Sequence, residues 1–466
     1  MSFASKFKNK FIGDKAFYKM VITLIVPIIV QSLITNFVNL LDNIMVGQVG
    51  TAQMSGVAIA NQLMFVFQLA LFGALSGVGI FTAQYFGAQD EDGVRASIRL
   101  KLAIGIVLCG LFILAASLWG KELISLFLTD SDDPAEVEVT LTEGLKYLRI
   151  ALVGVVPFML SQVYASSLKE GGETRLPMRA GIAAVLTNLV GNYILIYGKL
   201  GAPVMGVSGA SIATVISRFL EAFILIWFPS RQLDRFPYLG GLFRSLRIPG
   251  DMLKKVAIKG TPLMINELLW STGMSAITQS YSTRGLAAVA AVNINSTVFN
   301  LFSTVYFSFG TVIAIVVGQA LGAGELKKAR DLDNKVIFFS IMLSLAVGAV
   351  AFVLAPLFPQ LYNTTEEVRD LATSLLRVSC ICMPIGCTVH CCYFTLRTGG
   401  KTIITFLFDC VFVLAVAFPV SFVLSRFTDI SLVPLYLVIQ LLDLLKIAIG
   451  MTLVVKGVWI QNLVKD

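Results

Sequence analysis

Long apolar runs recur along the whole chain and constrain its fold more than any other feature. They lie near residues 19–43, 56–82, 99–119, 144–166, 178–198, 207–228, 256–280, 286–317, 336–358, 372–395, 402–424 and 432–455. A membrane-spanning helix needs roughly 20 apolar residues. Only helices or closed barrels satisfy every backbone polar group in lipid, and these runs are too long for barrel strands. The sequence therefore predicts an all-α membrane protein with twelve transmembrane helices.

The composition agrees with lipid as the main solvent. Of 466 residues, 56% are hydrophobic and 14% are charged, whereas a soluble domain carries about 25% charged residues. These values exclude a soluble enzyme and a disordered chain, and seven Cys are too few for a disulfide scaffold. The net charge of +8 does not indicate nucleic acid, because the basic residues lie in short loops between apolar runs. We expect a monomer in a lipid bilayer, since twelve helices make a self-sufficient bundle.

Lys and Arg concentrate in alternate connecting segments, on the same side as both chain ends. The positive-inside rule then places both termini in the cytoplasm. The basic N-terminal segment leads into a long apolar run without a small-residue cleavage site, so it does not resemble a cleaved signal peptide. We expect a multi-pass protein of the cell inner membrane.

The chain repeats itself after 235 residues. Matched pairs at this offset include Pro27/Pro262, Gln84/Gln319, Gly87/Gly322 and Arg95/Arg330. Each repeat holds six runs, so both halves enter the membrane the same way up, related by a pseudo-two-fold axis along its normal, with a cavity between them. The expected divisions are a cytoplasmic N-terminal segment (1–18), an N-terminal lobe (19–228), a cytoplasmic linker (229–255), a C-terminal lobe (256–455) and a cytoplasmic tail (456–466).

This duplicated architecture is typical of transporters, and no ATP site is visible. Gly400-Lys401-Thr402 resembles the end of a phosphate-binding loop, but Thr395 stands where the first glycine is required. Transport must then be coupled to an ion gradient, and this requires ionisable or cation-coordinating groups inside the membrane. Such groups are costly in lipid and mark functional sites.

A polar stripe runs along the first apolar run. Gln31, Thr35, Asn39 and Asp42 fall within about 80° of each other around a helix. Asp42 is the only acid in this run. The alternative is that Asp42 is an interfacial residue at a helix end.

Three further polar residues lie at a similar depth in the fifth and sixth runs. Asn188 and Asn192 are one turn apart, and Asn192 lies about 9 Å from Gly198 at the outer end. Thr214 lies about 12 Å from the outer end of the sixth run by the same helical rise. With Asp42 they form a set of oxygen ligands suited to a small cation, or a carboxyl that takes a proton.

In the second half, Glu267, Trp270 and Met274 share one helical face. An acid beside an aromatic ring suits an organic cation. The alternative is a structural Glu bonded to a neighbouring helix. Asn293 and Asn300 lie on one face of the eighth run and complete the expected cavity residues of this half.

Other intramembrane charges have less distinctive patterns. Asp443 is three residues from Lys446 and Arg218 is three residues from Glu221, which favours local ion pairs. Asp409 has no local partner, so its role is not assigned. The Cys380–Cys392 cluster lacks the spacing of a known zinc site, and we expect packing thiols rather than a metal. We expect no cofactor other than the coupling ion.

Several motifs together resemble the MATE (multidrug and toxic compound extrusion) family of transporters. They are Leu41–Thr51, Val57–Gln62, Ala83–Ala88, Asn192–Gly206, Gly209–Thr214 and Pro262–Gly273. The resemblance implies two six-helix lobes, alternating access, and Na⁺- or H⁺-driven export of amphipathic, often cationic drugs. It also implies a cation site at Asp42, Asn188, Asn192 and Thr214. We add Gln62, from the second motif, to the expected cavity residues.

Two departures from the family pattern limit which of the family's ion sites can be expected in this sequence. One branch of the family has an Asp in the fifth span where this chain has Asn192, so two-carboxylate proton chemistry is in doubt. Another branch has acids in the seventh and tenth spans, but run 372–395 contains no Asp or Glu. A second-lobe ion site with two carboxylates cannot be built from those positions.

Two other functions were weighed. A flippase for a polyprenyl pyrophosphate should line its cavity with several basic residues, whereas few lie well inside the runs, among them Arg149, Arg218 and Lys446. A membrane-embedded enzyme is disfavoured by one His and no nucleophile–base pair. One carboxylate among neutral oxygens slightly favours Na⁺ over H⁺ as the coupling ion.

Overall fold

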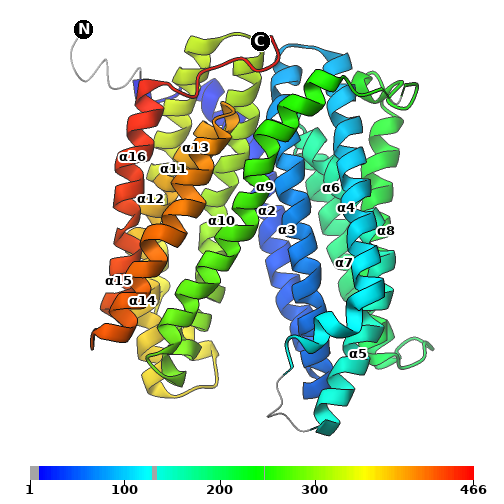
Figure 1. Cartoon of the computed structure of the whole chain (residues 1–466), viewed down its shortest axis with the longest axis vertical. Coiled ribbons are helices and arrows are strands. Elements are labelled where there is room, and N and C mark those ends of the chain that lie inside the picture. Colours follow the sequence, from blue (N-terminus) through cyan, green and yellow to red (C-terminus); the bar gives the residue numbers. More distant parts are fainter. Residues whose placement is uncertain (1–9, 129–133, 246, 466) are drawn as a thin grey trace. The chain divides into compact units, whose positions relative to one another are not determined.

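The computed structural model describes residues 10–128, 134–245 and 247–465, and all their side chains except those of residues 39, 40, 43, 44 and 51. These residues form helices and no strand, as expected for apolar runs of this length (Figure 1). The predicted all-α fold is therefore confirmed.

From Lys15 on, the described residues of the first half contain seven helices. They are α2 (Lys15–Gly47), α3 (Thr51–Gly87), α4 (Glu91–Ser125), α5 (Pro134–Val153), α6 (Val155–Glu170), α7 (Arg175–Tyr197) and α8 (Gly206–Ser230). The α5–α6 pair is bent by 48° and forms one broken span. A 3-10 turn, η1 (Pro237–Leu239), lies between the two halves.

The second half follows the same plan. Its elements are α9 (Gly250–Ser282), α10 (Leu286–Gly322), α11 (Leu326–Leu354), η2 (Pro359–Leu361), α12 (Glu366–Thr398), α13 (Thr402–Phe406), η3 (Leu407–Val411), η4 (Val413–Ala417), α14 (Phe418–Phe427), α15 (Leu432–Leu441) and α16 (Asp443–Lys456). The α13–α14 elements form one rod, in which η3 and η4 are π-helical. Pro419, the second residue of α14, has no N–H to donate, which favours a local change of hydrogen-bond pattern.

Twelve helical rods result in the described residues when α5–α6, α13–α14 and α15–α16 each count as one. Ten are long and apolar enough to cross a membrane, and the bent α5–α6 pair makes an eleventh. The remaining rod is α9, which begins with charged residues and carries Asn266 and Glu267 in its middle. The lower apolar content of α9 therefore comes from its charged first residues and from Asn266 and Glu267 in its middle.

Contacts divide the chain into two compact units. Unit 1 holds the described residues of Met1–Ile29, Ala83–Gln89 and Val256–Asp466, and unit 2 holds those of Val30–Thr82 and Asp90–Lys255. The lobe boundaries from the repeat, 19–228 and 256–455, stay a prediction.

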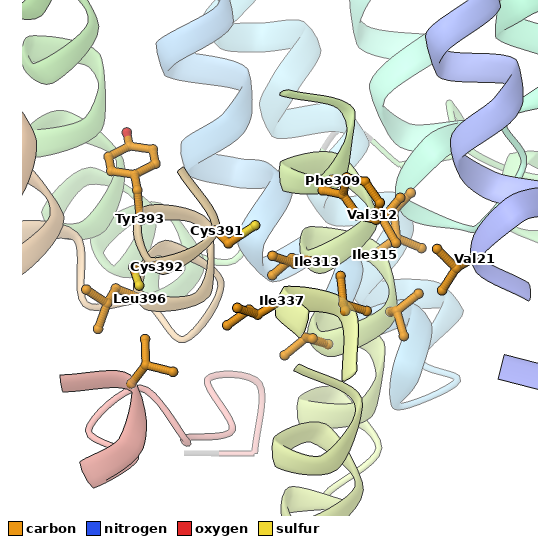
Figure 2. Packing of buried hydrophobic residues seen from close by; sticks show 14 of the residues in the cluster. Val21, Phe309, Val312, Ile313, Ile315, Ile337, Cys391, Cys392, Tyr393 and Leu396 are labelled. Atoms are coloured by element: carbon orange, nitrogen blue, oxygen red, sulfur yellow. The ribbon is translucent and has the colours of Figure 1, made fainter. Parts of the chain in front are cut away.

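The core of unit 1 is built around α10. Phe309, Ile313 and Val317 are fully buried there, and Cys391 of α12 packs into the same cluster (Figure 2). All seven Cys are free and buried. No group of His, Cys, Asp or Glu suited to a metal ion occurs in the described residues.

Residues matched by the repeat meet inside unit 1, where the last turn of α3 crosses α10. A Cβ added to Gly87 would overlap the backbone of Gln319, and one added to Gly322 would overlap the backbone of Gln84. Glycine and glutamine of each repeat thus contact glutamine and glycine of the other. This reciprocity is what a two-fold relation produces.

The repeat-matched arginines also play similar parts, each within its own unit. Arg95 of α4 donates to the carbonyls of Pro237 and Gly240, which follow α8, at 3.1 and 3.0 Å. Arg330 of α11 donates to the carbonyl of Val455 at the end of α16. Each arginine therefore fixes the segment that ends its half.

Candidate functional site

Asp42, Asn188, Asn192 and Thr214 meet in unit 2. Asn192 Nδ2 donates to Asp42 Oδ1 at 2.8 Å and lies 3.4 Å from Asn188 Oδ1. The Asn188 side chain in turn lies 3.0 Å from Thr214 Oγ1. Helices α2, α7 and α8 thus supply one carboxylate, two amides and one hydroxyl to a single cluster.

Small residues bring α7 and α8 close enough for this cluster to form. A Cβ added to Gly209 of α8 would lie 2.7 Å from the Leu195 carbonyl, and one added to Gly191 of α7 would lie 2.9 Å from Ala213 Cβ. Close packing of this kind is typical of helix pairs in lipid. It places Asn188 and Asn192 one turn apart on the face that meets Thr214.

The Asn188 amide links Asp42 to Thr214 when its nitrogen faces the carboxylate. In this orientation the nitrogen donates to both Asp42 oxygens, Oδ2 at 2.6 Å and Oδ1 at 3.1 Å, and the amide oxygen accepts from the Thr214 hydroxyl at 3.0 Å. The opposite orientation would turn the amide oxygen toward the carboxylate oxygens and is disfavoured. Asn188 thus supplies a donor to an ionised Asp42.

An oxygen ligand also remains free in the cluster. Asn192 is 2% exposed, and its Oδ1 has no hydrogen-bond partner in the described part of the chain. No Lys or Arg among the described residues lies within ion-pair distance of Asp42. A buried oxygen without a donor beside an uncompensated carboxylate suits a small cation.

These four residues all line a cavity in unit 2 of about 620 Å³, here called the Asp42 pocket. Three of the expected cavity residues also line it, namely Gln31, Thr35 and Gln62. Asn39 was expected there as well, but its side chain lies outside the described set.

Sequence reasoning missed several polar residues of this pocket. Tyr147 of α5 donates to Asn61 Oδ1 at 3.1 Å, and both line the cavity together with Gln162. Arg218 and Glu221 of α8 also line it. Their i, i+3 spacing suggested only a local ion pair, but no ion pair between them is found within 4.0 Å among the described residues.

Glu267 lies in a different environment in unit 1. Its carboxylate pairs with Arg397 of α12 at 3.3 Å and lies 3.5 Å from the Tyr393 hydroxyl. Arg397 lies just beyond the apolar run 372–395, yet it is 3% exposed inside the last turn of α12. This contact favours the alternative in which Glu267 is a structural acid, and its role in binding stays a prediction.

Asp409, left unassigned from the sequence, has a partner. Lys446 donates to Asp409 Oδ1 at 2.8 Å, rather than pairing with Asp443 as its spacing suggested. Asn266 Nδ2 bonds both Tyr393 and Asp409, at 3.2 and 3.3 Å. The paired-acid network is therefore continuous and consists of Asn266, Glu267, Tyr393, Arg397, Asp409 and Lys446.

The remaining expected residues of the second half do not join this network. Trp270 and Met274 of α9 are 37% and 39% exposed. Asn293 and Asn300 of α10 are exposed too. A substrate role for these four residues stays a prediction.

Comparison with known proteins agrees with the repeat and the fold. The profile of the MatE family matches residues 27–194 and 262–425, two segments that begin 235 residues apart. The probable multidrug resistance protein NorM of Thermotoga maritima is 26% identical over 424 residues, covering 89% of this chain and 87% of the relative. The probable multidrug resistance protein YoeA of Bacillus subtilis is 24% identical, covering 88% of this chain and 87% of the relative.

A solved structure shares the fold. It is an outward-facing conformation of a multidrug resistance MATE family transporter of the MOP superfamily, with a TM-score of 0.83 over 95% of this chain and 97% of that chain at 18% identity. The chain belongs to the MatE family and is a multi-pass membrane protein of the multidrug efflux transporters.

Proposed function

We propose that this transporter exports amphipathic, cationic small molecules in exchange for Na⁺ or H⁺, and that Asp42 binds the coupling cation. One observation carries the proposal: among the described residues, no Lys or Arg lies within ion-pair distance of Asp42, and the buried Asn192 Oδ1 next to it has no donor. A cation at Asp42 would compensate both groups. Asn188, Asn192 and Thr214 are the neutral ligands.

The coupling follows from charge. A buried carboxylate is disfavoured as an anion by desolvation, and a bound cation removes this penalty. The neutralised site can then reorganise between outward- and inward-facing states, whereas the charged site resists the change. A cationic substrate competes for the same carboxylate, so ion and substrate bind alternately.

The shape and chemistry of the Asp42 pocket fit an organic substrate. Its volume lies within the range of small-molecule sites. Phe65 and Phe158 give it apolar surface, while Gln31 and Gln62 offer adaptable hydrogen bonds. A polyprenyl pyrophosphate is a poorer fit, because Arg218 is the only basic residue among those lining the pocket.

We place the protein in the cell inner membrane as a monomer, with both termini in the cytoplasm. The positive-inside pattern supports this orientation. The bilayer and the transported small molecules are its partners, and nucleic acid is not.

A transport assay in proteoliposomes tests the proposal. Efflux of a fluorescent cationic dye is measured under imposed Na⁺ and H⁺ gradients for the wild type and for Asp42→Asn. Asparagine keeps size and hydrogen bonding but removes the charge, so gradient-driven efflux should be abolished while the protein still inserts. Asp370→Asn is the matched control, because Asp370 is exposed. Persistent gradient-driven efflux by Asp42→Asn would refute the assignment.

A further inference from the structure

Arg218 is a cation in the Asp42 pocket without an ion-pair partner among the described residues. It lies one turn beyond Thr214 on α8, about 6 Å further along the helix axis, and lines the same cavity. Its guanidinium carbon is 4.2 Å from the centroid of the Phe158 ring. No hydrogen bond or ion pair of this guanidinium is found among the described residues, whereas Arg397 in unit 1 is paired with Glu267.

Arg218 and Glu221 bring opposite charges to the α8 wall of the pocket. Glu221 lines the pocket beside Arg218, and Tyr147 faces Arg218 from α5. Glu221 attracts Lys169 of α6 as well as Arg218, so one negative charge is shared by two cations. The same pocket holds an acid, Asp42, and a cation, Arg218, and neither has an ion-pair partner within 4.0 Å among the described residues.

Stacking on Phe158 leaves the donors of Arg218 available. A guanidinium can rest its face on an aromatic ring and still direct its N–H groups to a planar acid in its own plane. A charge held in a low-dielectric site gains most from a partner of opposite sign. An acidic group of a bound molecule would supply this partner.

We propose, resting on the proposed function, that Arg218 is a specificity residue that binds a carboxylate or sulfonate of the substrate. The preferred substrates are then amphipathic zwitterions rather than simple cations. Their cationic group lies on the Asp42 side, their acidic group bonds Arg218, and their apolar body fills the space between. A substrate with a cationic group alone leaves Arg218 without a partner and is repelled by it.

Two dyes that differ in one group test this inference. Rhodamine 110 carries a free carboxylate, and rhodamine 123 is its methyl ester with the same cationic ring system. Binding to purified protein is followed by fluorescence anisotropy, which reports the ring-open form. Arg218→Gln should weaken binding of rhodamine 110 about tenfold, as expected for a lost charged hydrogen bond. Binding of rhodamine 123 should stay within about twofold or become tighter.

Further variants separate the charge of Arg218 from its packing. Arg218→Lys keeps the charge and should retain most of the affinity for rhodamine 110. Glu221→Gln removes the competing carboxylate and should tighten rhodamine 110 binding, so this variant decides the matter even where Arg218→Gln fails to fold. Arg149→Gln is the control, because Arg149 is exposed on α5 and does not line the pocket.

The outcomes distinguish this inference from the proposed function. Equal losses for both dyes in Arg218→Gln, or weaker rhodamine 110 binding in Glu221→Gln, would overturn the role of Arg218. Gradient-driven export of rhodamine 123 that depends on Asp42 upholds the proposed function whatever the dye preference. A wild type that exports neither dye under any gradient refutes the proposed function, and the anisotropy titration still decides the role of Arg218.

Discussion

The intramembrane acids of the two units are held in opposite ways. Asp42 in unit 2 is bonded by a neutral amide, and no basic residue lies within ion-pair distance of it in the described chain. Glu267 and Asp409 in unit 1 each have a cation of their own, Arg397 at 3.3 Å and Lys446 at 2.8 Å. Asp42 and Asp409 lie on apolar helical rods, whereas Glu267 lies on the more polar α9.

This difference decides which acid can exchange a cation with solution. A carboxylate already compensated by an arginine or lysine gains little from an added ion. A carboxylate among neutral oxygens gains much more, because the ion replaces lost hydration. An acid inside the membrane is therefore best judged by its partners, and depth in the span alone does not identify the coupling group.

The largest stability effect should come from breaking the Glu267–Arg397 pair. Glu267→Gln removes the acid that pairs with the buried Arg397 and should lower the free energy of unfolding by about 3 kcal/mol. Asp42→Asn removes no ion pair and should change it by less than about 1 kcal/mol. Thermal unfolding in detergent compares the two variants.

The double variant Glu267→Gln/Arg397→Gln is the control for this pair. Because both charges are then absent, it should recover most of the lost stability. A double variant less stable than Glu267→Gln alone would show that Arg397 is held by other contacts.

A smaller effect is expected at the link between the two ion pairs. Asn266 bonds Tyr393 and Asp409 through Nδ2, and its Oδ1 accepts the backbone N–H of Cys410 in the π-helical stretch at 3.3 Å. Asn266→Ala should lower the free energy of unfolding by about 1–2 kcal/mol. Asn293→Ala, at an exposed position of α10, is the comparison. Equal effects of both substitutions would argue against a connected network.

The smallest effect is expected among the neutral ligands of Asp42. Asn192→Ala removes one oxygen of several and should weaken cation affinity about fivefold, since a neutral contact contributes about 1 kcal/mol. Transport should remain coupled, with a higher half-saturating cation concentration. Complete loss of coupling in Asn192→Ala would mean that Asn192 is an indispensable ligand and not one oxygen of several.

Sequence periodicity went further for Asp42 than for the acids of unit 1, and the reason is physical. Asp42, Asn188, Asn192 and Thr214 could be grouped because helical rise fixes depth, and the structure brings these side chains together. Their role in coupling stays a prediction. The helices themselves follow from the length of the apolar runs.

The partners of the other acids could not be predicted, because they come from helices distant in sequence. Asp443 is three residues from Lys446, yet Lys446 of α16 bonds Asp409 in η3. Arg397 lies at the end of an apolar run, where a basic residue is typical of a loop, yet α12 continues past it. Periodicity gives the face of a helix and says nothing about what packs against that face.

Cation binding by the purified protein tests the central claim most directly. Na⁺ binding and proton release are measured in detergent for the wild type, for Asp42→Asn and for Glu267→Gln/Arg397→Gln. The account predicts that the double variant binds the cation as the wild type does, whereas Asp42→Asn binds none. Wild-type cation binding by Asp42→Asn, together with its loss in the double variant, would contradict the account and move the coupling site to unit 1.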